Sequence, residues 1–249
     1  MKKSKKIKSI LKWTALVVLV ILVCFTGVTI SEAFFSGVHS PDISGTGSKA
    51  NPMLIDNYLP KYDFTEVYEV EINATPEIAY RAIKEATLSD MSAVIRILLG
   101  LRELPEKLFG NKSTSMDSRK PILSQMQSGD SVILKEQAPN EIVFGMIVKG
   151  REGRFWEKSD NKISIASAEE FLAFRDPEYC WVISHFLVKD AANPGKVIVR
   201  TESRTMGLSM LAVKEFKPYW RVISPFSGLI RRLMLKAIKT RAEILMEGL

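Results

Sequence analysis

Three charged residues near position 200 have a spacing that could recognise a polar group. Arg200, Glu202 and Arg204 alternate along the chain, so on a β-strand their side chains share one face. The Glu202 carboxylate would then stay charged between two guanidinium groups. If this face lines a cavity, the charged triad (Arg200, Glu202 and Arg204) offers a polar anchor to an apolar ligand. If the face points outward, the triad is a solvated ladder of charges.

A histidine on a neighbouring apolar segment is a candidate acid or base. His185 has the same strand parity as Trp181 and Ile183. Imidazole titrates near neutral pH, so in a pocket it could transfer a proton, with Glu202 or Arg204 as its electrostatic partner. The simpler interpretation is a histidine at the edge of the core with one backbone partner. The candidate catalytic residues are thus His185, Glu202 and Arg204.

Aromatic residues on the same segments are candidate walls of a cavity, although aromatic side chains more often fill a core. Together with the charged triad they give the predicted ligand-binding set: Trp156, Phe171, Phe174, Trp181, Arg200, Glu202, Arg204, Tyr219 and Trp220.

Metal and nucleotide chemistry lack support in the sequence. The chain has only two histidines and two cysteines, too few for the clusters that hold zinc or iron. No nucleophile elbow, phosphate loop or dinucleotide-binding glycine pattern occurs. We therefore predict no metal and no cofactor.

The sequence of the N-terminal segment predicts a membrane anchor. Residues 13–31 are uncharged throughout and, as a helix, would reach about 28 Å, close to the thickness of a bilayer core. Six lysines precede them in residues 1–12, which predicts a cytoplasmic N-terminus and an extracytoplasmic domain. The small residues Ser31 and Ala33 leave the alternative of a signal peptide cleaved after Ala33, which would make the protein secreted.

The charge is concentrated at the two ends. The net charge is +7, yet six of the 35 basic residues lie in residues 1–12, so the remainder nearly balances the 28 acidic ones. A second basic group occupies the C-terminal segment and could touch lipid headgroups, although a solvated helix face is the simpler interpretation. Acidic residues are interspersed there, which argues against nucleic acid as a partner. The group is Arg231, Arg232, Lys236, Lys239 and Arg241.

The remaining chain divides into a Gly-, Ser- and Pro-rich linker at residues 32–57 and one domain at residues 58–249. Apolar alternation predicts a strand over residues 64–72, and Thr75 followed by Pro76 predicts a helix start. A second helix should begin near residue 89. A short helical turn at residues 121–127 and six strands should follow, the strands at residues 131–137, 141–148, 154–157, 169–174, 179–188 and 197–206.

The chain should end in a long helix that Pro225 interrupts and Ser227 restarts. This order predicts an α+β domain in which a curved antiparallel sheet wraps around the terminal helix.

That order, with the helix opening Asn73-Ala-Thr-Pro-Glu77, resembles the helix-grip fold of the START-like or SRPBCC superfamily, which includes polyketide cyclases, dehydrases and lipid transport proteins. Similar bacterial members share several segments, of which the last is the most specific. The segments are residues 58–63 (YLPKYD), 153–156 (GRFW), 169–174 (EEFLAF), 200–204 (RTESR) and 219–232 (YWRVISPFSGLIRR). The resemblance covers about residues 58–245.

The resemblance implies a cup for a hydrophobic molecule, although a fold of this kind serves many functions. We therefore expect a membrane-tethered domain that binds a hydrophobic small molecule or lipid. The alternatives are an enzyme of the cyclase or dehydratase kind and a structural or partner-binding module whose interior is filled.

Overall fold

The computed structural model describes residues 38–40, 52–90, 117, 119–127, 131–149, 163 and 165–248. The chain divides into two compact units, Met1–Gly37 and Val38–Leu249, and all described residues lie in the second. The predicted anchor at residues 13–31, the body of the second predicted helix, the predicted strand at residues 154–157 and Trp156 lie outside the described residues. Among the residues that are described, no helix combines the length and apolarity needed to cross a membrane.

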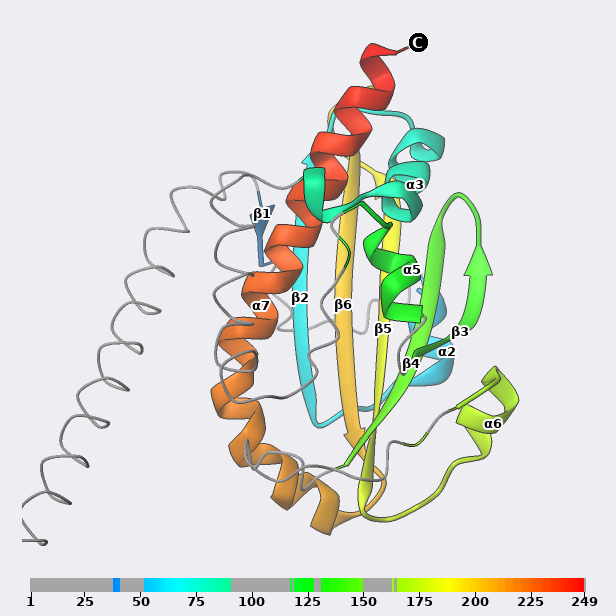
Figure 1. Cartoon of the computed structure of the whole chain (residues 1–249), viewed down its shortest axis with the longest axis vertical. Helices are drawn as coiled ribbons and strands as arrows, with labels where there is room; N and C mark the ends of the chain where they lie inside the picture. Colours follow the sequence, from blue (N-terminus) through cyan, green and yellow to red (C-terminus); the bar gives the residue numbers. More distant parts are fainter. Residues whose placement is uncertain are drawn as a thin grey trace, which may run out of the picture. The chain divides into compact units, whose positions relative to one another are not determined.

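The described strands form one antiparallel sheet in the order β1-β2-β6-β5-β4-β3 (Figure 1). Their bounds are β1 Val38–His39, β2 Phe64–Ile72, β3 Ser131–Gln137, β4 Glu141–Lys149, β5 Tyr179–Asp190 and β6 Val197–Gly207. The last strand, β6, lies between β2 and β5, because β2 pairs with β6 from Phe64↔Thr205 to Ile72↔Val197. Four of the predicted strands thus match β3, β4, β5 and β6 closely, and the predicted first strand matches β2.

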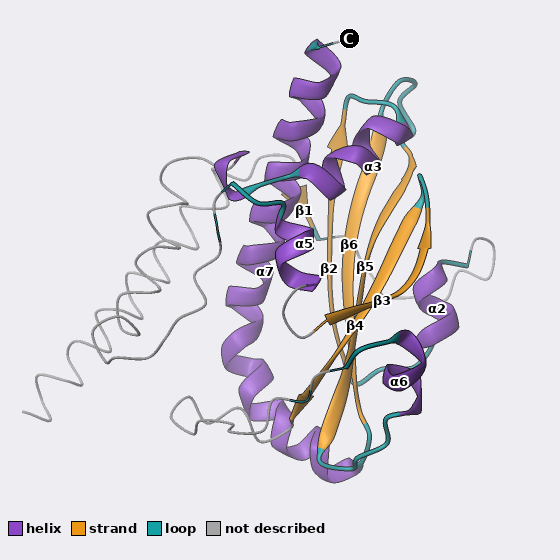
Figure 2. Cartoon of the chain, turned by 45° about the vertical axis from the view of Figure 1, so that its right-hand side comes forward, coloured by secondary structure: helices purple, strands orange, loops and turns teal. Residues whose placement is uncertain are grey.

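Two layers of helices cover opposite faces of the sheet (Figures 1 and 2). The inner face packs against α7 (Met210–Glu247), α3 (Pro76–Glu85) and α5 (Ile122–Gln127). The outer face packs against α2 (Leu54–Tyr58) and α6 (Ala168–Ala173). A mixed α+β fold with a long C-terminal helix along an antiparallel sheet is confirmed, and it is consistent with the helix grip.

The helix α3 starts as the sequence predicts. The Thr75 side chain accepts a hydrogen bond from the Ile78 amide, and Pro76 occupies the first turn. Its inner side buries Ala79, Ala82 and Ile83. Between α3 and residue 90, where the described segment ends, the chain forms a short 3-10 turn, Leu88–Asp90.

The C-terminal helix is continuous, so the predicted break at Pro225 is wrong. Pro218 and Pro225 both lie inside α7 on its solvent side. Each proline removes a hydrogen bond to the carbonyl four residues earlier, and those residues, Lys214 and Arg221, are exposed, so water can satisfy their carbonyl groups. Ser227 does not cap a new helix but donates a hydrogen bond to Glu66.

Two shorter segments also differ from the sequence-based expectation. Residues 169–174 belong to the helix α6 instead of a strand, because Ser167 caps the Glu170 amide and Glu170 in turn accepts a hydrogen bond from the Ala166 amide. Within the predicted linker, Val38 and His39 pair with β2, and residues 54–58 form α2.

A glycine allows α7 to lie close to the sheet. A Cβ atom at Gly228 would overlap the hydroxyl group of Tyr68 on β2. A larger residue at this position would require either the Tyr68 side chain or the helix to shift, so Gly228 allows the close approach of α7 to β2.

Candidate functional site

The charged triad forms as predicted, but it lies on the outer face. Arg200 Nη2 and Arg204 Nε each lie 2.6 Å from a Glu202 carboxylate oxygen, and the Glu202 side chain is 2% exposed. The register pairs Glu202 with Val67 and with His185, which share the face turned toward α2 and away from α7. The triad is therefore neither a solvated ladder nor part of the wall beside α7.

Further charges extend the triad at both ends. Arg200 Nη1 lies 3.1 Å from a Glu69 oxygen, and Lys189 binds the same oxygen at 2.9 Å. Arg204 Nη1 donates to Asp56 at 2.7 Å and to the Leu59 carbonyl at 2.9 Å, which ties β6 to α2 and to the loop after it. This outer charge network anchors α2 to the sheet.

The electrostatics of this network follow from burial and pairing. Burial alone would raise the pKa of Glu202, but the hydrogen bonds and charges of Arg200 and Arg204 outweigh it and hold that pKa below its ordinary value. Burial would likewise lower the pKa of Arg204, whereas Glu202 and Asp56 raise it. The triad is thus held in its charged form.

His185 belongs to the same face and is fully buried. Its Nδ1 lies 2.5 Å from Glu141 Oε1, and the Glu141 carboxylate also accepts hydrogen bonds from the amides of Leu54 and Ile55 at the start of α2. Its Nε2 has no hydrogen-bond partner and lies 3.9 Å from a Glu202 oxygen. The partner of His185 is therefore a carboxylate and not the backbone group that the simpler interpretation expected.

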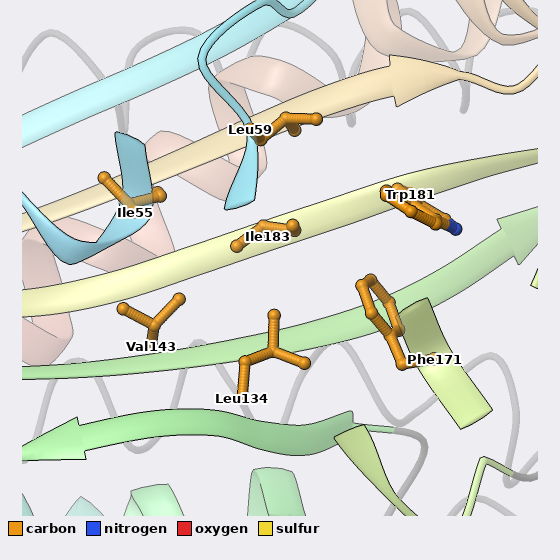
Figure 3. Close-up of a cluster of buried hydrophobic side chains, with 7 residues drawn as sticks. All are labelled: Ile55, Leu59, Leu134, Val143, Phe171, Trp181 and Ile183. Atoms are coloured by element: carbon orange, nitrogen blue, oxygen red, sulfur yellow. The ribbon is translucent and has the colours of Figure 1, made fainter. Parts of the chain in front are cut away.

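An apolar cluster lies on the same outer face (Figure 3). Phe171 of α6 is fully buried and its ring lies 5.2 Å from that of Trp181. A Cβ at Gly145 of β4 would lie 2.8 Å from the Phe171 ring, so the glycine leaves the space that the ring occupies. The cluster consists of Ile55, Leu59, Leu134, Val143, Phe171, Trp181 and Ile183.

A second set of polar side chains lies on the inner face, against α7. Arg231 Nη1 donates to Thr201 at 3.1 Å, and Arg231 Nη2 lies 3.5 Å from Ser184 Oγ. Ser184 and Ser203 share a hydrogen bond of 2.7 Å across β5 and β6, and Ser227 donates to Glu66 at 2.6 Å. We call this set the inner polar cluster; it consists of Glu66, Ser184, Thr201, Ser203, Ser227 and Arg231.

The two ionisable groups of the inner polar cluster are poorly compensated. Burial raises the pKa of Glu66 despite the hydrogen bond from Ser227 and the charge of Arg231. Burial also lowers the pKa of Arg231, and its Nε atom, 3.4 Å from Glu66, has no hydrogen-bond partner. Both shifts disfavour the charged forms, in contrast to the outer charge network.

An apolar cavity of about 10 Å³ lies on the same side of the sheet, enclosed by α3, α5, β5 and α7. Met234 and Ile238 of its wall follow Arg231 by three and seven residues, so they share its side of the helix. The lining is Ile83, Ala86, Ile122, Leu123, Phe186, Met234 and Ile238. A space of this size holds about one water molecule.

A more open pocket of about 280 Å³ lies at the start of α7. It is lined by Lys61, Tyr62, Asp63, Met206, Gly207, Ser209, Met210 and Val213. Tyr62 also stacks on Arg204, with 4.9 Å between the guanidinium carbon and the ring centre, so this pocket borders the outer charge network.

The structure separates the predicted ligand-binding residues into two groups. The charged triad, His185, Phe171 and Trp181 lie on the outer face. Phe174 directly follows α6 and lies edge-on against Tyr179, which has the strand parity of Trp181, so it belongs with the outer group. Tyr219 and Trp220 pack with Phe64 and Phe216 between the sheet and the first half of α7. Because a sheet separates the two groups, they cannot line one cavity together, and their role in binding stays a prediction.

The inner polar cluster was missed in the sequence. A signal was present, because Glu66 interrupts the apolar face formed by Phe64, Tyr68, Val70 and Ile72 of one strand. The prediction that Arg231 and Arg232 belong to a solvated or headgroup-facing surface is wrong. Arg231 contacts Thr201 and Glu66, and Arg232 stacks on the Tyr68 ring at 5.1 Å.

Comparisons with known proteins give low similarity. No protein-family model matches the sequence, and no curated protein does. Among solved structures, that of CalU16 from Micromonospora echinospora is 9% identical, with 72% of this chain and 84% of that chain covered and a TM-score of 0.26. That of human STARD10 is 7% identical, with 74% and 66% covered and a TM-score of 0.25. Likenesses this weak carry no argument about function.

Proposed function

We propose that this chain is a membrane-tethered START-like domain that binds a hydrophobic small molecule or lipid between the inner face of the sheet and α7. One observation carries the proposal: an apolar cavity and a cluster of incompletely paired polar groups lie on the same side of α7. Ligand sites combine an apolar wall with a few converging polar groups in this way.

The inner polar cluster is difficult to explain by stability alone. Burying an arginine next to a carboxylate costs desolvation energy, and apolar residues of similar size usually stabilise a core as well or better. In the outer charge network the cost is offset by short, well-oriented ion pairs, whereas Arg231 contacts two hydroxyl groups and one carboxylate at 3.1–3.5 Å. A ligand that completes these contacts would account for the arrangement.

The small volume of the cavity sets a condition on binding. A molecule larger than water enters only if side chains of α5 or α7, such as Leu123 and Met234, move aside. The proposal therefore includes a displacement of these walls on binding.

The tether supports this function physically. If residues 13–31 cross the membrane, the domain stays close to the bilayer and meets lipids at a high effective concentration. A hydrophobic ligand is then transferred over a short distance without crossing bulk water.

The alternative of a cyclase-like or dehydratase-like enzyme relied on His185 with Glu202 or Arg204. These groups lie on the outer face beneath α2, and Glu141 already binds both His185 and the start of that helix. An acid–base pair in this position is separated by the sheet from a ligand beside α7.

Analysis of the co-purified material tests the proposal. We expect the full chain, purified gently and examined by native mass spectrometry, to carry a discrete extra mass that organic extraction removes. The variant Ala86→Leu adds three carbons to the cavity wall and should lower this occupancy, whereas Leu172→Ala on α6 should not. A wild-type protein without extra mass that also fails to take up an added lipid extract would contradict the proposal.

A further inference from the structure

In the part of the chain that the structure describes, the charges around the inner polar cluster do not balance. Arg231 and Arg232 are consecutive on α7 and both face the sheet, where Tyr68 lies beneath Arg232 and Glu66 lies beside Arg231. Among the described residues, Glu66 is the one carboxylate in contact with Arg231, and Arg232 contacts the Tyr68 ring. Glu202, on the other face, is already held by Arg200 and Arg204. Among the residues that the structure describes, the guanidinium groups of Arg231 and Arg232 therefore carry one positive charge more than the carboxylate beside them.

Arg231 also has more donors than acceptors around it. A guanidinium group carries five N–H donors. The described partners are the hydroxyls of Thr201 and Ser184 and the Glu66 carboxylate, and the buried Nε atom makes no hydrogen bond. Hydroxyl oxygens are weaker acceptors for a guanidinium than a carboxylate, which can accept two N–H groups at once. An additional anionic acceptor would fit here.

Glu66 does not prevent the approach of a second anion. Its pKa is raised by burial, so neutralising it by a proton costs less than for an exposed glutamate. Ser227 can hydrogen-bond either form of the carboxyl group, because a hydroxyl both donates and accepts.

We propose that the ligand of this site is an amphiphile with a carboxylate head, of the fatty-acid class, whose head binds Arg231 and whose chain lies along Met234 and Ile238. The inference rests on the proposed function, because it names the polar end of the same ligand. Two guanidinium groups, those of Arg231 and Arg232, lie here with the single carboxylate of Glu66, so one further negative charge would balance them. The cavity beyond it is lined by apolar side chains.

Paired probes of equal length test the head group. We would titrate the full chain with decanoate and with decan-1-ol by isothermal titration calorimetry. Since a hydrogen bond to a charged group contributes about 1.5–3 kcal/mol, decanoate should bind about 10-fold to 100-fold more tightly than the alcohol. Arg231→Met should abolish this preference and leave the affinity for the alcohol within about twofold.

Three further variants separate charge from folding. Glu66→Gln removes the competing carboxylate and should strengthen decanoate binding, the opposite sign to Arg231→Met. The pair Glu66→Gln with Arg231→Met removes both members of the buried ion pair, so it should fold even if Arg231→Met does not, and it should bind both probes equally. Arg221→Met removes the same charge from the exposed side of α7 and should change neither affinity.

The outcomes distinguish this inference from the proposed function. Equal binding of decanoate and decan-1-ol by the wild type, or a preference that survives Arg231→Met, would overturn the carboxylate assignment while the hydrophobic site stands. Binding of neither probe would overturn the carboxylate assignment, and failure to take up an added lipid extract as well would overturn the proposed function.

Discussion

Replacing Glu202 by glutamine should lower the free energy of unfolding by about 3–5 kcal/mol, because it leaves Arg200 and Arg204 buried without their shared carboxylate. Urea unfolding of the full chain measures this change. The matched control is Glu178→Gln, which breaks the surface ion pair with Lys149 and should cost no more than about 1 kcal/mol.

A combined replacement shows whether the loss of unfolding free energy in Glu202→Gln comes from the unpaired charges of Arg200 and Arg204. Replacing all three residues of the triad, by Arg200→Met, Glu202→Leu and Arg204→Met, should restore most of the lost stability. Buried ion pairs can be replaced by apolar residues of similar size without loss of stability. A loss below about 1 kcal/mol in Glu202→Gln would show that the outer charge network does not stabilise the fold as described.

The same network makes stability depend on pH in a defined direction. The pKa of Glu202 in the folded chain lies below its ordinary value of 4.5, because Arg200 and Arg204 outweigh the effect of burial. Its stabilisation is therefore fully present above about pH 4.5 and is lost as the pH falls through the folded-state pKa. Glu202→Gln should accordingly flatten the acid side of the stability profile.

Replacing Phe171 by alanine should cost about 3–5 kcal/mol, the usual range for removing a fully buried aromatic ring. The ring packs against Trp181 and Gly145 and so joins α6 to the sheet. An alanine at this position would leave the space of the ring empty. Urea unfolding followed by tryptophan fluorescence measures the loss. Because the ring lies on the outer face, ligand binding beside α7 should be retained in the fraction that remains folded.

The neighbouring Leu172 supplies the control. Its side chain is 36% exposed on the same helix, so Leu172→Ala should cost much less than Phe171→Ala. Similar losses for both variants would mean that α6 is not anchored by the Phe171 ring.

The sequence predicts strands better than it predicts the face on which their side chains lie. The alternation of Arg200, Glu202 and Arg204 correctly places the three side chains together, because side-chain direction on a strand depends only on parity. Which face of the sheet meets α7 depends on how distant segments pack. The short helix α2, from a segment predicted as linker, binds Arg204 of the triad through Asp56, and only the fold reveals this.

Local signals also competed with one another. The segment around Phe171 has strand-like apolar residues, but Ser167 and Glu170 form a helix start that decides the outcome. At Pro225 the local rule for a break is overridden, because α7 keeps its buried side along the sheet and exposes the two prolines. The buried pair of Glu66 and Arg231 joins residues far apart in sequence, so spacing alone could not identify it.

The central claim is that a hydrophobic ligand binds beside α7 and not beneath α2. A fatty acid carrying a photoactivatable diazirine in its chain tests this directly, when it is bound to the full chain, irradiated and mapped by peptide mass spectrometry. We expect labelling on the inner side, at residues such as Leu123, Phe186, Met234 and Ile238, and loss of labelling when unlabelled fatty acid competes. Competable labelling concentrated at Ile55, Leu59 or Ile183 on the outer face would contradict it.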